Sequence, residues 1–249
     1  MNVADDEPLV AERSTHVHSE IARLARIVHG TNSSENITPA AVLDKVATAA
    51  VELLPVVDHA GVTLVHKRHR LSRPELRSTA ETGSVPRTFD GLQHKYGEGP
   101  CFEAIWTHNT VYIDDVRNET RWPALMAAVC AQTTIRSTLS IQLYVVDLEL
   151  GALNLFSETP NAFDTTTENL ADTLATHAAI ALNTARRSEQ FRSALASRDI
   201  IGQAKGIIME RFDIDAVHAF DILRRLSQES NTPVAEIAAQ LVKTDHPSR

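Results

Sequence analysis

The residues from Ser197 to Lys243 read SRDIIGQAKGIIMERFDIDAVHAFDILRRLSQESNTPVAEIAAQLVK, and this stretch contains three short helical patterns. Asp215 is suited to cap the second helix, and Thr232 followed by Pro233 is suited to start the third. Apolar residues recur at intervals of three and four in each pattern. Because nucleation of a short helix is costly, the three helices are expected to bury their apolar stripes together as a small bundle. The stripe residues are Ile200, Ile201, Ala204, Ile207 and Ile208, then Ala219, Phe220, Leu223 and Leu226, then Val234, Ile237, Ala238, Leu241 and Val242.

Charge alone does not mark this bundle as a nucleic-acid binder. Residues 197–249 contain seven basic and eight acidic side chains, so the polar faces resemble a solvated helix surface with ordinary ion pairs. The order of residues is more specific. It resembles the ANTAR domain, a three-helix RNA-binding module of transcription antiterminators. SRDIIGQAKGIIMER is similar to the first helix of that family, AFDILRRLSQESN to the second and AEIAAQLV to the third.

The resemblance implies binding of stem-loops in nascent mRNA, where unpaired loop nucleotides can be read. Cations would neutralise phosphates, and amides would contact base edges. The implied RNA-binding residues are Arg198, Gln203, Lys205, Arg211, Arg224, Arg225, Ser227, Gln228 and Asn231. The implied packing residues are Ile201, Ala204, Gly206, Met209, Ala219, Leu223 and Ala238.

Two of these residues have specific interpretations. Gly206 lies inside a helical pattern, where glycine costs roughly 1 kcal/mol relative to alanine, so it predicts the close approach of another backbone or a ligand. Ser227 is expected either to contact RNA or to satisfy local backbone groups.

Composition describes an ordinary globular chain of 249 residues, with 43% apolar residues and a net charge of −8. This negative charge disfavours general binding to nucleic acid or to anionic membranes. No apolar run reaches membrane-spanning length and the N-terminus lacks a signal-peptide pattern, so we expect a cytoplasmic protein without a membrane partner. Cys101 and Cys130 lack metal-type spacing and are expected to be thiols.

The N-terminal region alternates helical and strand patterns. Residues 1–15 predict a disordered tail, a helix is expected from Ile21 to Gly30, and Thr38 with Pro39 starts another that ends at Pro55. Strands are expected in HAGVTLVH, LRSTAETG, TVYIDD, RSTLSIQLYVV and LGALNLFSE, and helices in GPCFEAIWTH and PALMAAVCAQTT. This order predicts an α+β domain, an antiparallel sheet with flanking helices.

The strings KYGEGPCFEAIWTHNTVYIDDVRNETRWP and LSIQLYVVDLELGALNLFSETPNAFD resemble a GAF domain of the type found ahead of ANTAR modules in actinobacterial regulators. GAF domains bind small molecules or act as dimer scaffolds, and the fold does not say which. No cofactor is identified, and an unknown small-molecule ligand of the GAF domain stays open. The resemblance implies domains over 16–183 (GAF) and 197–243 (ANTAR), with a tail over 244–249.

Cys101 is the candidate for redox or ligand sensing. It follows Gly99 and Pro100 at an expected helix N-terminus, where the helix dipole would lower the pKa of its thiol. Because some GAF proteins reduce methionine sulfoxide with cysteines, a redox enzyme is the alternative to a non-enzymatic regulator. Cys130 is expected in the core. His66 and His69 are expected in a basic surface turn, and no metal site is predicted.

A connecting helix is expected over residues 166–196, capped by Asp164 or Thr165. Its small residues are spaced like a coiled-coil seam or, equally, like the face of a helix packed on its own sheet. These residues are Ala171, Leu174, Ala178, Ala181, Ala185 and Ser188. Because the GAF core ends near Asn183, the later part predicts a homodimer formed through this helix and the GAF domain. The function expected is transcription antitermination on paired RNA hairpins, controlled by a signal or an upstream partner through the GAF domain. The alternative is a sensor whose bundle binds protein or DNA.

Overall fold

The computed structural model describes residues 19, 22, 38–66, 75–145 and 148–245. The chain forms two compact units that divide between Arg186 and Arg187. The predicted tail over 1–15, most of the predicted helix from Ile21 to Gly30, and His69 lie outside the described residues. Every helix in the described ranges is too short or too polar to span a lipid bilayer.

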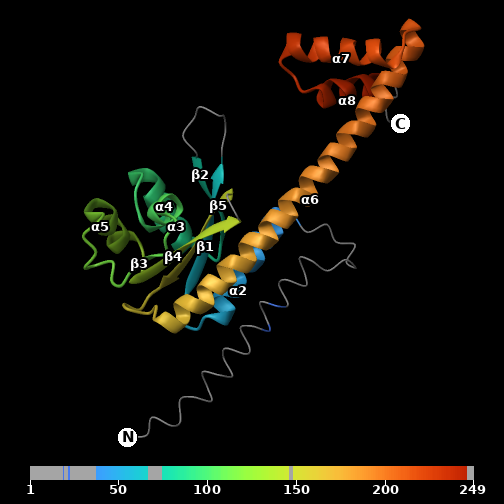
Figure 1. Cartoon of the computed structure of the whole chain (residues 1–249). Helices are drawn as coiled ribbons and strands as arrows, with labels where there is room; N and C mark the ends of the chain where they lie inside the picture. Colours follow the sequence, from blue (N-terminus) through green and yellow to red (C-terminus); the bar gives the residue numbers. More distant parts are fainter. Residues whose placement is uncertain (1–18, 20–21, 23–37, 67–74, 146–147, 246–249) are drawn as a thin grey trace, which may run out of the picture. The chain divides into compact units, whose positions relative to one another are not determined.

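The N-terminal unit is built on a five-stranded sheet in which every neighbouring pair is antiparallel. The strand order is β2-β1-β5-β4-β3 (Figure 1). All five strands predicted from the sequence are present. Their bounds are His59–His66 (β1), Glu75–Glu81 (β2), Val111–Ile113 (β3), Ser137–Val145 (β4) and Leu148–Ser157 (β5).

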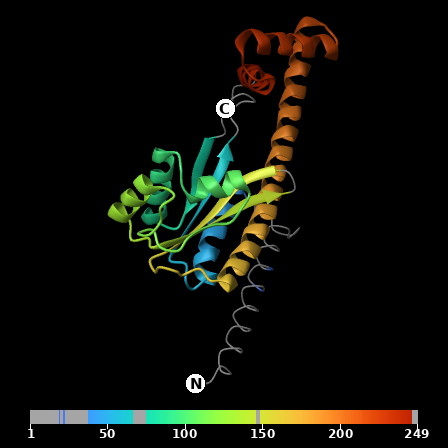
Figure 2. The same cartoon turned by 60° about the vertical axis from the view of Figure 1, so that its left-hand side comes forward.

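One face of the sheet is covered by α2 (Pro39–Leu53) and by the first half of α6 (Thr165–Phe212) (Figures 1 and 2). Thr38 caps α2 as predicted, because its hydroxyl oxygen accepts a 3.2 Å hydrogen bond from the backbone N–H of Ala41. Asp164 caps α6 in the same way, accepting from the N–H of Thr167 at 2.7 Å.

The small residues of α6 pack on the sheet and α2 of their own chain. The buried members are Ala171, Leu174, Ala178, Ala181 and Ala185. Of the two interpretations of this stripe, the structure therefore shows the helix on its own sheet. The small alanine side chains of α6 allow the helix to pack closely on the strands. Because they are buried there, they cannot form a coiled-coil seam with another chain.

The other face of the sheet carries α3 (Ser84–Tyr96), α4 (Pro100–Thr107) and α5 (Pro123–Gln132) (Figure 2). Phe89 of α3 packs there against Phe156 of β5, with ring centroids 5.0 Å apart. No helix was predicted from the sequence over the residues of α3. Two of its core-facing residues, Asp90 and Gln93, are polar, which hides the apolar period that identifies a buried helix.

The helix α6 runs without a break for 48 residues, roughly 70 Å at 1.5 Å per residue. The predicted end of the connecting helix at residue 196 is therefore wrong, because the first helix of the bundle is the same helix. Gly202 and Gly206 do not interrupt it. The bundle is completed by α7 (Ala216–Ser230) and α8 (Val234–Asp245), so helical residues also occupy the start of the predicted tail at 244.

Gly151 of β5 is the tightest point of the sheet. Its φ is +156°, and a Cβ atom there would overlap the carbonyl oxygen of Thr63 in β1. We predict that Gly151→Ala lowers the free energy of unfolding of this unit by about 3 kcal/mol or more, because the obstacle is backbone. Gly91→Ala is the matched control, since a Cβ there meets nothing within 4 Å among the described residues and alanine is favoured inside α3 by about 0.5–1 kcal/mol.

Urea unfolding followed by tryptophan fluorescence measures both variants, because the chain has two tryptophans, Trp106 and Trp122, and both lie in this unit. A loss below about 1 kcal/mol for Gly151→Ala would contradict the close approach of β1 and β5.

Candidate functional site

The C-terminal unit is a three-helix bundle formed by the end of α6, α7 and α8. Its buried residues come from all three helices: Ala204, Ile208, Ala219, Leu223 and Ala238. Ile200, Ile201 and Met209 are partly buried against them, as are Val234, Ile237, Leu241 and Val242 of α8. Alanines at three of the five central positions allow the helices to approach closely.

Two interpretations of the apolar stripes need correction. Phe220 and Leu226 of α7 are 40% and 45% exposed, so they lie outside the core. In the described structure α7 packs against α6 and α8, and the side of α7 that faces them carries the buried residues Ala219 and Leu223. Gly206 does not mark a close approach within this chain, because a Cβ there would meet nothing within 4 Å in the described part of the structure.

The predicted caps of the bundle have different outcomes. Asp215 caps α7 as predicted, accepting from the backbone N–H groups of Val217 at 3.0 Å and His218 at 2.9 Å. Thr232 does not act as expected. The helix α8 begins at Val234, and the Thr232 hydroxyl instead donates a 3.2 Å hydrogen bond to the carbonyl of Ser230.

Three of the predicted RNA-binding residues share the solvent face of α7. Arg224 and Arg225 are adjacent, Gln228 follows them by four and three residues, and all three side chains are exposed. Arg224 pairs with Asp221 at 3.1 Å, but this pair is exposed and therefore contributes little to stability. These side chains are thus available to an anionic ligand at little cost to the fold.

The other predicted RNA-binding residues are spread over α6 and the turn between α7 and α8. On α6, Arg198, Gln203 and Arg211 are exposed and Lys205 is half-buried. Asn231 is exposed and ends α7 in a left-handed conformation, with φ of 50°.

Ser227 has the local role that the sequence left open. Its hydroxyl donates a 2.6 Å hydrogen bond to the carbonyl of Thr232, so it fixes the turn between α7 and α8.

Cys101 lies at the N-terminus of α4 as predicted, but its expected acidity is wrong. The thiol is 1% exposed. Burial raises the pKa of Cys101 to about 12, and the nearby charge of Asp90 adds to this effect. Loss of solvation therefore outweighs the helix dipole. Cys130 is exposed on α5, although it was expected in the core.

A buried polar network surrounds Cys101. The carboxylate of Asp90 accepts hydrogen bonds from the hydroxyls of Thr63 at 3.2 Å and Ser78 at 2.8 Å. It also accepts one from the side-chain amide of Gln93 at 3.0 Å, and the Gln93 carbonyl accepts from the backbone N–H of Cys101 at 2.9 Å. Burial nevertheless raises the pKa of Asp90 to about 6, because these bonds only partly replace water.

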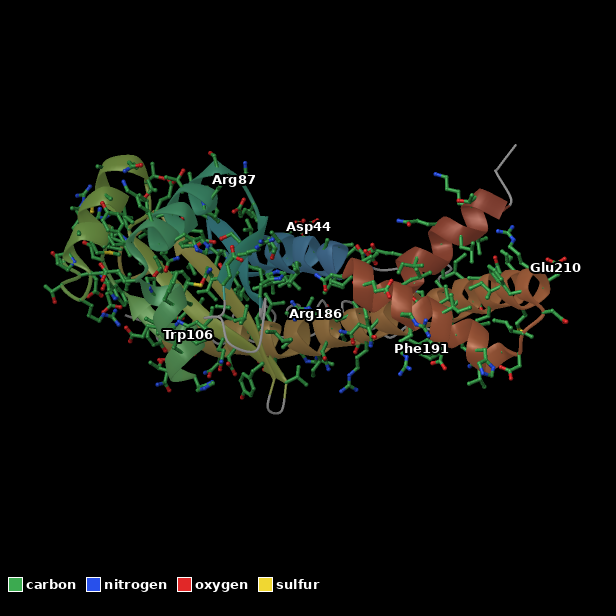
Figure 3. All side chains as sticks on the ribbon, turned by 90° about the horizontal axis from the view of Figure 1, so that it is seen from above. Asp44, Arg87, Trp106, Arg186, Phe191 and Glu210 are labelled. Carbon is green, nitrogen blue, oxygen red and sulfur yellow. The ribbon has the colours of Figure 1, made fainter. Side chains whose placement is uncertain are left out.

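An open groove of about 1070 Å³ lies beside this network. Its lining comes from β2, the end of α3, and α4: Glu75, Leu76, Arg77, Ser78, His94, Gly97, Phe102 and Trp106. Trp106 is 44% exposed (Figure 3). The His94 and Phe102 rings meet edge to face at 5.8 Å, and burial lowers the pKa of His94. Because Ser78 both lines the groove and donates to Asp90, the groove wall is connected to the buried carboxylate.

No group of three or more histidine, cysteine, aspartate or glutamate side chains among the residues that the structure describes is arranged to hold a metal ion.

We predict that Asp90 makes the N-terminal unit less stable as pH rises. Its pKa is about 6 in the fold against an ordinary value of 3.8, so the folded state binds the proton more tightly. The contribution of Asp90 to the free energy of unfolding is therefore complete below pH 3.8 and is lost as pH rises through 6. The loss amounts to roughly 3 kcal/mol.

Asp90→Asn should therefore gain stability relative to the unchanged protein as pH rises, as measured by urea unfolding through tryptophan fluorescence. Asp44→Asn, which removes an exposed carboxyl from α2, is the control (Figure 3). A stability difference between Asp90→Asn and the unchanged protein that does not vary with pH would show that Asp90 is not held in this way.

Two family models match the chain. One is described as GAF domain and matches residues 36–183, and the other is described as ANTAR domain and matches residues 189–242. No protein in the curated set matches. ANTAR domains are RNA-binding antitermination modules, and GAF domains are signal-sensing modules.

Solved structures also resemble the chain. A free methionine-R-sulfoxide reductase from Neisseria meningitidis is 21% identical, with a TM-score of 0.52 over 76% of this chain and 96% of that one. The GAF domain of an Acinetobacter phosphoenolpyruvate-protein phosphotransferase is 19% identical, with a TM-score of 0.49 over 68% and 95%. At 21% identity, the likeness to the Neisseria reductase shows the fold alone. With a family model over more than half of its length, the chain belongs to the GAF domain family, and it carries an ANTAR domain in its C-terminal unit.

Proposed function

We propose that this protein is a cytoplasmic transcription antiterminator whose bundle binds paired stem-loops in nascent mRNA. The main support is the solvent face of α7, which presents Arg224, Arg225 and Gln228 within the segment that matches the ANTAR model. Cations that are exposed and held by a rigid helix suit phosphates, and the amide suits a base edge. The remaining cations and amides of α6 and the α7–α8 turn extend the same site.

The proposed mechanism needs binding alone. An RNA that folds either as an antiterminator or as a terminator hairpin is a two-state equilibrium. A protein that binds the antiterminator hairpins stabilises that state by its binding free energy, so the terminator loses population. This account requires no catalytic residue.

A redox activity through Cys101 is the alternative that the fold of the Neisseria reductase raises. The environment of Cys101 disfavours it. A buried thiol whose pKa is raised to about 12 has almost no thiolate near neutral pH, and the thiolate is the reactive form. We therefore propose that the protein is not an enzyme.

We also propose a homodimer, but through a different face of α6 from the alanine stripe. In the C-terminal unit, Phe191, which Figure 3 labels, is 66% exposed, and Leu195 is 45% exposed. Gly202 lies seven residues after Leu195, and Gly206 lies four residues after Gly202, so both fall on the same side of the helix. A Cβ at either glycine meets nothing within 4 Å in the described chain. This face of α6 therefore carries exposed apolar side chains at Phe191 and Leu195, and no side chains at Gly202 and Gly206. Such a surface fits a second copy of the same helix.

The dimer would place two sets of cations side by side. By helical spacing, Arg198 lies at the edge of this face, so pairing of the two α6 helices would bring the Arg198 side chains of the two protomers close together. Two bundles held at a fixed separation suit two RNA loops, because the second binding event becomes intramolecular. This arrangement compensates for the acidic balance of a single bundle.

The signal is proposed to enter through the GAF domain. The groove beside β2 offers aromatic walls and a hydroxyl, Ser78, that contacts buried Asp90. A small molecule or an upstream partner there would act on the unit whose sheet holds the first half of α6.

We predict that Arg224→Gln with Arg225→Gln weakens binding to paired hexaloop hairpins by roughly 10-fold at low salt. The slope of log affinity against log salt should fall by about 2, since two phosphate contacts are lost. Electrophoretic shifts over a salt series measure both quantities. Lys243→Gln is the control, because it removes an exposed cation from α8. An unchanged slope in the double variant would place the RNA on another face.

We predict that Leu195→Glu converts the dimer to monomers, weakening self-association by about 100-fold or more, because a buried unpaired charge opposes pairing. Ala196→Glu is the matched control, since it puts the same charge on the next exposed residue, which faces another side of α6. Sedimentation velocity at micromolar concentration measures the difference. A monomeric unchanged protein, or a dimeric Leu195→Glu variant, would contradict this arrangement.

A further inference from the structure

Two large apolar side chains of α7 face solvent beside the cations of the proposed RNA-binding face. Val217 is 69% exposed and Phe220 is 40% exposed. Together with Arg224 and Gln228, they are spaced three, four and four residues apart, so all four lie on one side of the helix. Leu223, on the buried side of α7 with Ala219, is 1% exposed. The solvent face of α7 is therefore apolar in its N-terminal half and cationic in its C-terminal half.

Acidic groups make the N-terminal half of this face unsuited to phosphate. A helix N-terminus ordinarily attracts anions, but here the carboxylate of Asp215 already accepts from the N–H groups of Val217 and His218. Asp221 lies between the apolar and cationic parts and pairs with Arg224 at 3.1 Å. A phosphate would be repelled by these carboxylates, whereas an uncharged nucleobase would not.

The size of the apolar patch argues against a protein partner. A stable protein interface buries about 800 Å² on each side. On this face of α7, the exposed apolar side chains among the described residues are those of Val217 and Phe220, with charged residues before and after them in the sequence. Leu226 is 45% exposed but lies on another side of the helix. One aromatic ring is, however, the size of one base. Bases in RNA loops are unstacked, and proteins bind them by stacking on aromatic side chains.

On the basis of the proposed RNA-binding function, we infer that Phe220 stacks on one unpaired base of the RNA loop, while Arg224 and Arg225 hold phosphates further along α7. Phe220 then contributes to RNA affinity by stacking on a base, and the two arginines contribute by their charge interactions with phosphates. The two contributions are separable, because stacking does not depend on salt in the way that phosphate contacts do.

The test uses the full chain and paired hexaloop hairpins, with an abasic nucleotide placed at each loop position in turn. We expect Phe220→Leu, which keeps an apolar side chain but removes the ring, to weaken binding by about 5-fold to 100-fold. Phe220→Tyr should bind within about 3-fold of the unchanged protein. The salt slope should be the same in all three proteins. One abasic position should weaken binding to the unchanged protein but add little to the effect of Phe220→Leu, which shows that ring and base are coupled.

Other results would overturn the inference. If Phe220→Leu binds as tightly as the unchanged protein, or if no abasic position is coupled to it, Phe220 does not stack on a base. If Tyr and Leu variants lose affinity equally, the ring has a structural role. If RNA affinity is unchanged while self-association weakens, the face belongs to a second copy of the chain. In each case the proposed function survives as long as the unchanged protein prefers hairpin RNA to duplex DNA; loss of that preference removes both.

Discussion

The continuity of α6 is the constraint on which both units depend. In the N-terminal unit, its buried alanines pack on the sheet and on α2, and Ala185 is near the end of that contact. In the C-terminal unit, the same helix supplies Ala204 and Ile208 to the core of the bundle. The bundle is too small to fold from α7 and α8 alone, since two short helices cannot bury their stripes. The first half of α6 therefore completes the packing of the GAF sheet, and its last turns complete the core of the ANTAR bundle.

The polar network around Asp90 is the main departure from an apolar core. A buried carboxylate with three hydrogen bonds, and with no cation partner among the residues that the structure describes, costs stability at neutral pH. Proteins that keep such groups commonly do so at functional sites. Here Ser78 connects Asp90 to the groove, so a ligand hydrogen-bonded to Ser78 would change the balance of that network. The backbone N–H of Cys101 belongs to the same network through Gln93, and the Cys101 side chain is buried beside it.

Local signals in the sequence predicted most of the fold. Thr38, Asp164 and Asp215 cap the helices that they were expected to cap, because capping depends on a few neighbouring residues. Features that depend on distant residues were predicted less well. The helix α3 was missed because Asp90 faces the core, and the acidity of Cys101 was wrong because burial by other elements outweighs the dipole of its own helix. The exposure of Phe220 depends on which side of α7 faces α6 and α8, which no local pattern shows.

The central claim is that the bundle recognises RNA hairpins, and the unchanged protein tests it most directly. Electrophoretic shifts at one fixed salt concentration would compare paired hexaloop hairpins with duplex DNA of the same length and charge. Loop recognition predicts tighter binding to the hairpins, because their unpaired bases are accessible and the duplex bases are not. Equal affinity for the two nucleic acids would mean that α7 contacts phosphates alone, and it would contradict the account of this protein as an antiterminator.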